Sequence, residues 1–209
     1  RVSRGLGDVY KRQLLFTGRP LVLTEEAVNI PSILNVWFGG SEAGDAIADV
    51  LFGKVNPSGK LTTSFPRSVG QLPLYYNSHN TSRPDPDKNV FNRYTSNYLE
   101  DSNEPLYPFG YGLSYTHFQY DNMVLSSNVL KKGEKLTVSV IVTNKGNYDG
   151  CEVVQLYLHD IYADVVRPVK ELKDFKRIFL KKGESREVRF VITEEDLKFY
   201  NSNLQYIYE

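Results

Sequence analysis

The sequence predicts an α/β segment followed by an all-β sandwich of the immunoglobulin type. Two observations predict this order. Before residue 74, short apolar runs are combined with a helical period, which is typical of the end of an α/β layer. After residue 118, apolar and polar residues alternate in short runs separated by turns, which is typical of a β-sandwich.

The α/β segment is expected to contain strands and one clear helix. Residues 14–16 and 32–37 are short apolar runs of strand length. A helix is expected after Ser41, which can cap it, and Gly53 should end it. Residues 61–65 predict one more strand. This is too little to close a sheet, so the segment is expected to be the end of a larger α/β sandwich domain.

The predicted β-sandwich begins at residue 118. Apolar side chains alternate with Thr and Ser from residue 136 onward, so one face of that strand is expected to be buried. Acidic residues 194–196 suit the first turn of a short helix. Further strands are predicted at residues 153–158, 172–180 and 187–192.

Composition excludes several classes of partner. Lys plus Arg and Asp plus Glu both number 25, so the formal net charge is zero. Nucleic-acid-binding proteins and proteins that bind anionic membranes favour a basic excess, and neither partner is expected here. No apolar run approaches the roughly 20 residues that span a bilayer. The single cysteine excludes a disulfide within the chain.

Residues 1–13 differ from the rest of the chain. They are basic, contain two glycines and show neither helical nor strand periodicity. No apolar region follows the charges, so this is not a secretory signal peptide. We interpret these residues as a non-native leader.

A long loop and an aromatic segment connect the two predicted bodies. Residues 74–104 are polar and irregular, and a loop of this length usually binds something or packs on a partner. The segment after it combines prolines, which remove backbone donors, with glycines, which permit unusual backbone angles. Its rings gain most when covered. We therefore expect a structural seam between two packed bodies, formed by Pro105, Tyr107, Phe109, Gly110, Tyr111, Gly112 and Tyr115.

The segment 105–118, PLYPFGYGLSYTHF, resembles the junction in glycoside hydrolase family 3 between the α/β sandwich domain and the C-terminal fibronectin-III-like domain. The resemblance covers about residues 14–209. The loop that precedes the seam is most similar to that of periplasmic β-glucosidases of Gram-negative bacteria. The other matching blocks are residues 18–23, 43–53, 56–60, 65–71, 152–157, 167–172 and 182–185.

The resemblance implies a domain plan. Residues 14–73 would end the α/β sandwich domain, residues 74–117 would form the long loop and the interdomain seam, and residues 118–209 would form the fibronectin-III-like domain. A complete domain of this family continues with a last strand beyond Glu209. We therefore expect a sandwich that is incomplete at its C-terminal end, and a chain truncated at both ends.

The resemblance also implies an activity. The parent protein would be an exo-acting retaining β-glucosidase that releases glucose from β-glucoside oligosaccharides and needs no cofactor. Such enzymes use two carboxylates roughly 5 Å apart. In the family, both lie upstream of the motif at residues 18–20, so no catalytic residue is assigned and the fragment is expected to be inactive. The relatives imply a periplasmic or secreted location. The alternatives are a β-xylosidase or other family 3 glycosidase, and a non-catalytic module that binds glycans or proteins.

Four residues of the long loop are candidates for the rim of a substrate site or for a subunit interface. Tyr94 and Tyr98 could stack on sugar rings, because a polar loop leaves rings exposed. Asp101 and Glu104 could reach a sugar or a neighbouring subunit, as in a homodimer of the full-length protein. The alternative for all four is an ordinary structural or solvated role.

The remaining candidates favour structural interpretations. Trp37 lies in an apolar run and is expected in the core. His79, His117 and His159 are dispersed along the chain, whereas a metal site needs clustered ligands, so no metal is expected.

Overall fold

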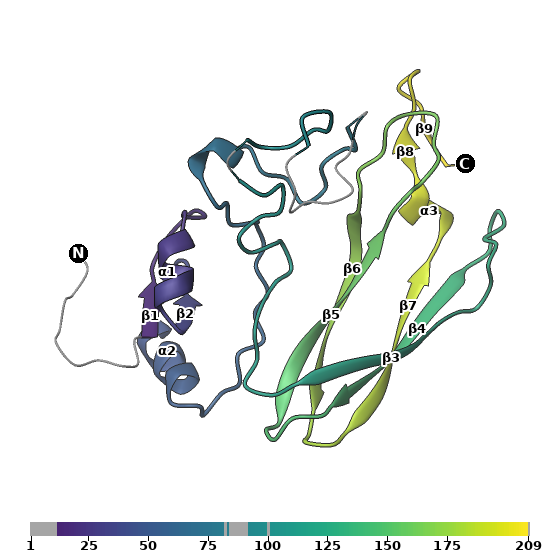
Figure 1. The fold of residues 1–209 in the computed structure, drawn as a ribbon. Helices are drawn as coiled ribbons and strands as arrows, with labels where there is room; N and C mark the ends of the chain where they lie inside the picture. The colour runs from purple at the N-terminus through teal and green to yellow at the C-terminus, as the bar shows by residue number, and fades with distance from the viewer. Residues whose placement is uncertain (1–11, 82, 84–91, 100, 209) are drawn as a thin grey trace.

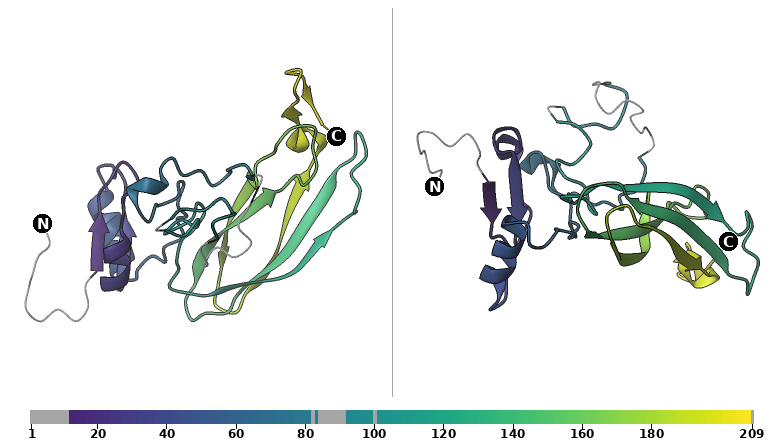
Figure 2. Two further views of the ribbon diagram at one scale, coloured as in Figure 1. Left: turned by 45° about the horizontal axis from the view of Figure 1, so that its top comes forward. Right: turned by 90° about the horizontal axis from the view of Figure 1, so that it is seen from below.

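The computed structural model describes residues 12–81, 83, 92–99 and 101–208. Within them, a small α/β layer and a larger body of β-strands lie on either side of extended connecting segments (Figures 1 and 2). The predicted combination of an α/β segment with an all-β body is therefore present. No helix in the described part of the chain is long and apolar enough to cross a membrane.

The α/β layer consists of two parallel strands and two helices. Strand β1 (Arg12–Leu15) pairs in parallel with β2 (Ser32–Asn35), which confirms both predicted strands. Helix α2 (Ala43–Leu51) is the predicted helix, and α1 (Thr24–Asn29) was not predicted. Because β1 includes Arg12 and Gln13, the last two residues of the expected leader lie in a strand. The rest of that leader lies outside the described residues.

Two details of the predicted α/β segment are wrong. Ser41 does not cap α2; the N-cap position belongs to Glu42, which makes no side-chain cap bond. A backbone turn closes the helix start instead, with the Ala43 amide donating to the Gly40 carbonyl at 3.1 Å. Gly53 does end the helix, with a φ of 76°. Residues 61–65 do not form a regular strand; they make interrupted backbone bonds to the aromatic seam.

The body of β-strands contains two antiparallel sheets (Figure 1). One has the strand order β3-β4-β7 and the other pairs β5 with β6. Their bounds confirm the predicted strands and add one at the seam; they are β3 (Phe118–Leu125), β4 (Leu136–Asn144), β5 (Gly150–Leu158), β6 (Glu171–Leu180) and β7 (Ser185–Ile192). The short helix α3 (Glu194–Leu197) begins with a capping box between Thr193 and Asp196 and confirms the prediction for the acidic residues. Strands β8 (Phe199–Tyr200) and β9 (Tyr206–Ile207) form a hairpin after it.

The hydrophobic core lies inside this body. The alternation in β4 places Val138 and Val142 in the core, as predicted. Thr143, which should face outward, is instead 7% exposed and bonds to Ser185 at 2.8 Å. The core cluster consists of Val138, Val142, Val154, Leu180, Val188, Phe190 and Ile192.

Candidate functional site

The aromatic seam, residues 105–115, forms backbone bonds along the α/β layer. The Leu61 amide donates to the Tyr111 carbonyl at 2.8 Å, and the Gly110 amide donates to the Leu61 carbonyl at 2.7 Å. Further along, the Phe65 amide donates to the Tyr107 carbonyl at 2.8 Å. These bonds do not form a continuous ladder, because Pro108 has no amide hydrogen and Gly110 turns the chain with a φ of 81°.

Two glycines of the seam permit a close approach of backbones. A Cβ on Gly112 would overlap the carbonyl oxygen of Gly59 in the α/β layer. A Cβ on Gly110 would overlap the side chains of Gln155 and Tyr157 on β5. The seam is therefore in contact with both bodies, and at these positions it has no room for a larger residue.

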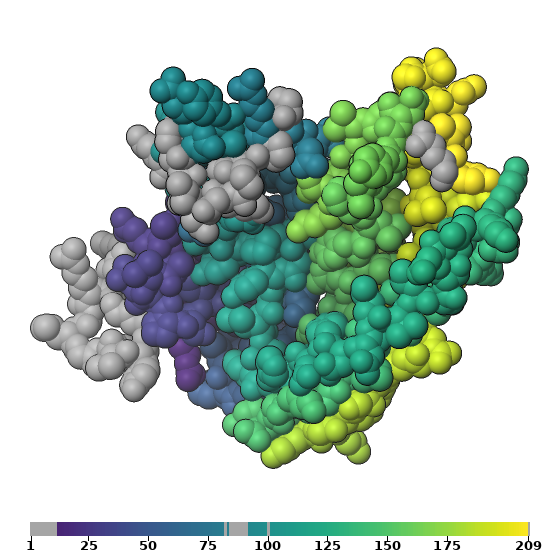
Figure 3. Space-filling model, turned by 45° about the vertical axis from the view of Figure 1, so that its right-hand side comes forward, coloured from purple at the N-terminus to yellow at the C-terminus, as the bar shows by residue number. Residues whose placement is uncertain are grey.

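Rings from three segments pack together at the seam. Phe109 stacks on Tyr76 of the long loop, with ring centroids 4.0 Å apart. The ring of Tyr157 on β5 meets both of them edge-on, at 6.3 and 6.5 Å. Tyr107 stacks on Tyr111 at 5.3 Å. These rings contact one another and are not arranged as a free platform for a ligand. On the face shown in Figure 3, this part of the chain fills the space between the α/β layer and the sandwich.

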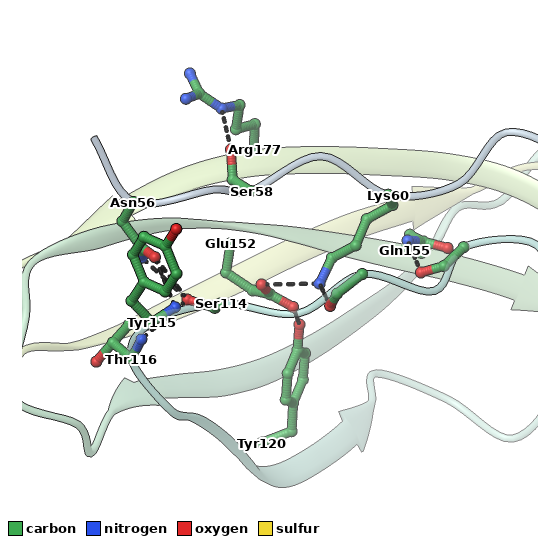
Figure 4. Close-up of polar contacts among 12 residues, drawn as sticks. Asn56, Ser58, Lys60, Ser114, Tyr115, Thr116, Tyr120, Glu152, Gln155 and Arg177 are labelled. Atoms are coloured by element: carbon green, nitrogen blue, oxygen red, sulfur yellow. Dashed lines mark hydrogen bonds and ion pairs between the residues drawn. The ribbon is translucent and has the colours of Figure 1, made fainter. Parts of the chain in front are cut away.

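Asn56 joins the turn after α2 to the end of the seam (Figure 4). Its Oδ1 accepts bonds from the Tyr115 amide at 2.8 Å and from the Ser114 hydroxyl at 3.1 Å. The Tyr115 hydroxyl in turn donates to the Val50 carbonyl, the last turn of α2, at 2.9 Å. A Cβ on Gly150, the first residue of β5, would overlap the Asn56 amide.

An ion pair lies beside the contact between Asn56 and the end of the seam. The Lys60 ammonium is 3.2 Å from the Glu152 carboxylate, and their side chains are only 16% and 9% exposed. Lys60 also donates to the Gly112 carbonyl at 3.1 Å. The Tyr120 hydroxyl donates to Glu152 Oε1 at 2.9 Å (Figure 4). Partial burial and the neighbouring Glu152 carboxylate raise the pKa of Tyr120 far above its usual value, so this hydroxyl keeps its proton and remains a donor.

The long loop is held to the α/β layer at its base. Gln71 is completely buried; its Oε1 accepts the Arg67 amide at 2.6 Å and its Nε2 donates to the Ser102 carbonyl at 2.7 Å. The Ser68 hydroxyl donates to the Asp101 carboxylate. Sequence reasoning did not single out Gln71, since a lone glutamine carries no sequence signal of burial.

The long loop is also bonded to the sandwich. The Val169 amide donates to the Ser78 carbonyl at 2.9 Å, and the Leu172 amide donates to the Tyr76 hydroxyl at 3.3 Å. His79 forms an isolated β-bridge with Pro168. One loop therefore contacts both bodies.

The four rim candidates differ in exposure. Tyr94 is 64% exposed, with the Arg93 guanidinium 5.0 Å from the centre of its ring. Tyr98 is 37% exposed, and its hydroxyl donates to the Gln71 carbonyl at 3.1 Å. Asp101 and Glu104 are half-buried at the loop base, where Asp101 accepts the Ser68 hydroxyl. The structure thus brings Tyr98, Asp101 and Glu104 close to Gln71, while Tyr94 has the more exposed of the two rings.

The remaining candidates lie apart from this loop. Trp37 is half-buried against Phe65, with ring centroids 5.9 Å apart, so it packs beside the seam. Its backbone has a φ of 57°, an uncommon conformation for a residue with a side chain. Among the residues that the structure describes, no three His, Cys, Asp or Glu side chains are grouped as metal ligands.

The fold and the seam define a two-body region in which an α/β layer is joined through aromatic packing to a β-sandwich. Residues 13–115 match the glycosyl hydrolase family 3 C-terminal domain, and residues 152–209 match the fibronectin type III-like domain. The chain belongs to glycoside hydrolase family 3, as the resemblance implied, and matches the C-terminal domains of that family.

Relatives with curated names include glucosidases and xylosidases. The chain is 53% identical over 194 residues to a periplasmic beta-glucosidase of Salmonella typhimurium, covering 92% of this chain and 25% of that protein. It is 47% identical over 196 residues to a beta-xylosidase of Formosa agariphila, covering 94% and 26%. The chain therefore spans about a quarter of the length of these relatives.

Solved structures show the same fold. A beta-glucosidase from Listeria innocua in complex with isofagomine matches with a TM-score of 0.89 and 46% identity, covering 94% of this chain and 27% of that one. A β-glucosidase from Erythrobacter marinus matches with a TM-score of 0.84 and 40% identity, covering 94% and 24%.

Proposed function

We propose that this chain is the C-terminal region of an exo-acting retaining β-glucosidase that removes terminal β-D-glucosyl residues from β-glucosides. The observation that carries the proposal is the 53% identity to the Salmonella periplasmic beta-glucosidase over almost the whole chain. The fold supports it, since the Listeria beta-glucosidase has the same arrangement over 94% of this chain. The Salmonella relative, which is named as periplasmic, supports a periplasmic location for the protein.

Within such an enzyme, this region would act as a brace. Retaining glycosidases need two carboxylates about 5 Å apart on either side of the sugar. The two carboxylates with the clearest partners at the seam and the loop base are already engaged, Glu152 with Lys60 and Asp101 with Ser68. The family resemblance puts both catalytic carboxylates upstream of the motif at residues 18–20, so we place them outside this chain and expect the chain alone to be inactive. The long loop, held by both bodies, would line the entrance or a dimer interface.

A β-xylosidase is the second candidate, because the Formosa beta-xylosidase is 47% identical over a similar length. A glucoside and a xyloside differ by one hydroxymethyl group on the sugar ring. Residues that contact this hydroxymethyl group would lie near the reacting sugar, together with the catalytic carboxylates.

A non-catalytic binding module is the third candidate. The exposed ring of Tyr94 is the feature that favours it, because aromatic rings stack on sugars. Glycan binding by the chain that is lost in Tyr94→Ala, and less so in Tyr98→Ala, would support this candidate. A chain that binds no glycan would favour the brace.

A chimera tests whether this region can support catalysis by a β-glucosidase; the sugar preference of the chimera would come from its Salmonella part. The corresponding region of the Salmonella beta-glucosidase is replaced by residues 14–209 of this chain, and hydrolysis of aryl β-glucosides and aryl β-xylosides is measured. We expect the chimera to retain glucosidase activity and the chain alone to have none. Turnover by the chain alone would contradict the assigned brace role. A folded chimera without activity would show that this region does not serve a β-glucosidase.

A further inference from the structure

The contact between the α/β layer and the sandwich contains a largely buried ion pair between Lys60 and Glu152. We propose that Lys60, Glu152 and Tyr120 form an interdomain latch that holds the sandwich at one orientation on the α/β layer and thereby positions the long loop. The proposal concerns the chain itself and does not depend on which sugar the parent protein hydrolyses.

Three separate parts of the fold meet at the Glu152 carboxylate (Figure 4). Glu152 belongs to β5, in the two-stranded sheet. Tyr120, which donates to one carboxylate oxygen, belongs to β3 in the opposite sheet. Lys60, which pairs with the other oxygen, follows the turn of the α/β layer. A single carboxylate therefore connects both sheets of the sandwich with the neighbouring body.

The energy of the Lys60–Glu152 ion pair depends more strongly on the orientation of the sandwich than the energy of the ring packing around it does. Stacked rings such as Phe109 and Tyr76 tolerate a range of offsets while they stay covered. A buried ion pair adds little net stability over apolar side chains of the same volume, but separating its members leaves an unpaired charge without water. Since Lys60 is 16% and Glu152 9% exposed, any tilt that pulled them apart would carry this penalty. Orientation, rather than overall stability, is what such a pair can specify.

The orientation of the sandwich in turn sets the position of the loop. Ser78 is bonded to Val169 of the sandwich, whereas Ser102 is bonded to Gln71 of the α/β layer. A rotation of one body against the other would therefore move one end of the loop relative to its other end. Tyr94 and its neighbours lie between these two ends.

Two hydrogen bonds from backbone amides of the sandwich to the long loop report on this coupling from a distance. Leu172 lies opposite Tyr157, five residues beyond Glu152 along β5, which is about 17 Å at roughly 3.4 Å per residue. The amides of Leu172 and Val169 both bond to the loop. A substitution that acted only on the packing around Lys60 would not reach them.

Hydrogen exchange measured on the full 209-residue chain tests the latch. In Lys60→Met and in Glu152→Gln, we expect the Val169 and Leu172 amides to exchange on the order of tenfold faster, with the β4–β7 ladder unchanged. Lys198→Met removes an ion pair with the exposed Glu195 on the sandwich surface and serves as the matched control. This control should leave both reporter amides unchanged.

A double variant keeps the test decisive if a single substitution unfolds the chain. Lys60→Met/Glu152→Met removes both charges and leaves none unpaired, so the fold should persist while Val169 and Leu172 still exchange faster. Unchanged exchange at these two amides in the folded double variant would overturn the proposal, because the apolar seam alone would then set the orientation. Loss of protection in the β4–β7 ladder of the double variant would also overturn it, since the latch would then support the sandwich itself. Neither outcome bears on whether the parent protein is a glucosidase.

Discussion

The sandwich and the α/β layer differ in how they bury their apolar residues. All seven residues of the core cluster belong to strands of the sandwich. Neither α1 nor α2 contains a buried residue, although α2 has a clear apolar face. The sandwich therefore has a core of its own, whereas the buried residues of the α/β layer, such as Phe65 and Gln71, lie next to the seam and the loop base. A clear apolar pattern in the sequence thus leads to full burial in the sandwich strands and not in helix α2.

The open face of the α/β layer has a physical explanation. Parallel sheets are normally covered on both faces. Here the described sheet has two parallel strands, β1 and β2. An open groove of about 630 Å³ remains between β2 and α2, lined by Leu34, Val36, Ile47 and Val50 among others. The relatives are about four times as long as this chain, and we propose that the additional chain of the parent protein covers this face.

The largest expected effect comes from the sandwich core. Phe190 is 2% exposed, so Phe190→Ala should lower the free energy of unfolding by about 3–5 kcal/mol. Ile47 on α2 is only half-buried, and Ile47→Ala should lower it by about 1 kcal/mol or less. Urea denaturation followed by circular dichroism measures both. Equal losses would mean that the two bodies share one core after all.

The seam should be nearly as sensitive to added volume. In Gly112→Ala the new methyl group would overlap the carbonyl of Gly59, which is backbone and cannot move aside cheaply. We expect a loss of about 1–3 kcal/mol in the free energy of unfolding. Gly59→Ala is the matched control, because a Cβ there would meet no atom within 4 Å. A difference between these neighbours would separate close packing from a general intolerance of alanine.

The base of the long loop should respond locally. Gln71→Ala leaves the Arg67 amide and the Ser102 carbonyl without their partner, which costs about 1–3 kcal/mol for groups that stay buried. Because the loop loses its bonds to the α/β layer, trypsin should cleave after Arg93 faster than in the unsubstituted chain. The exposed Gln119, changed to Ala, should leave this rate unchanged. Equal cleavage of all three proteins would show that the sandwich contacts alone hold the loop.

The smallest effect is expected at the surface turn before β7. The Lys181 amide and then Arg186 bond to Glu184 and hold its pKa below the usual value. A lowered pKa in the folded state means that the stabilisation is fully present above the ordinary glutamate pKa and is lost as the pH falls through the lowered value. Glu184→Gln should therefore be slightly less stable than the unsubstituted chain at neutral pH, and the difference in stability should vanish in acid. A difference that persisted in acid would assign the effect to something other than charge.

Much of the fold could be predicted because patterns of a few neighbouring residues determine its helices and strands. Alternation in β4 and β7, the glycine that ends α2 and the acidic first turn of α3 all act over a few residues. The failures have the opposite character. Residues 61–65 have strand composition, but their partner is the seam, whose proline and glycine interrupt the ladder. The unpredicted strand β3 begins at Phe118, where its pairing with β4 decides the conformation.

The candidate site divides in the same way. The sequence predicts the aromatic seam, because prolines, glycines and rings in one segment indicate packing rather than flexibility. The roles of Lys60, Gln71 and Glu152 came only from the tertiary structure. A lysine, a glutamine and a glutamate are ordinarily exposed, and only contacts between residues tens of positions apart in the chain bury them. Local chemistry thus determined the elements of this chain, and long-range burial of polar groups decided how those elements are joined.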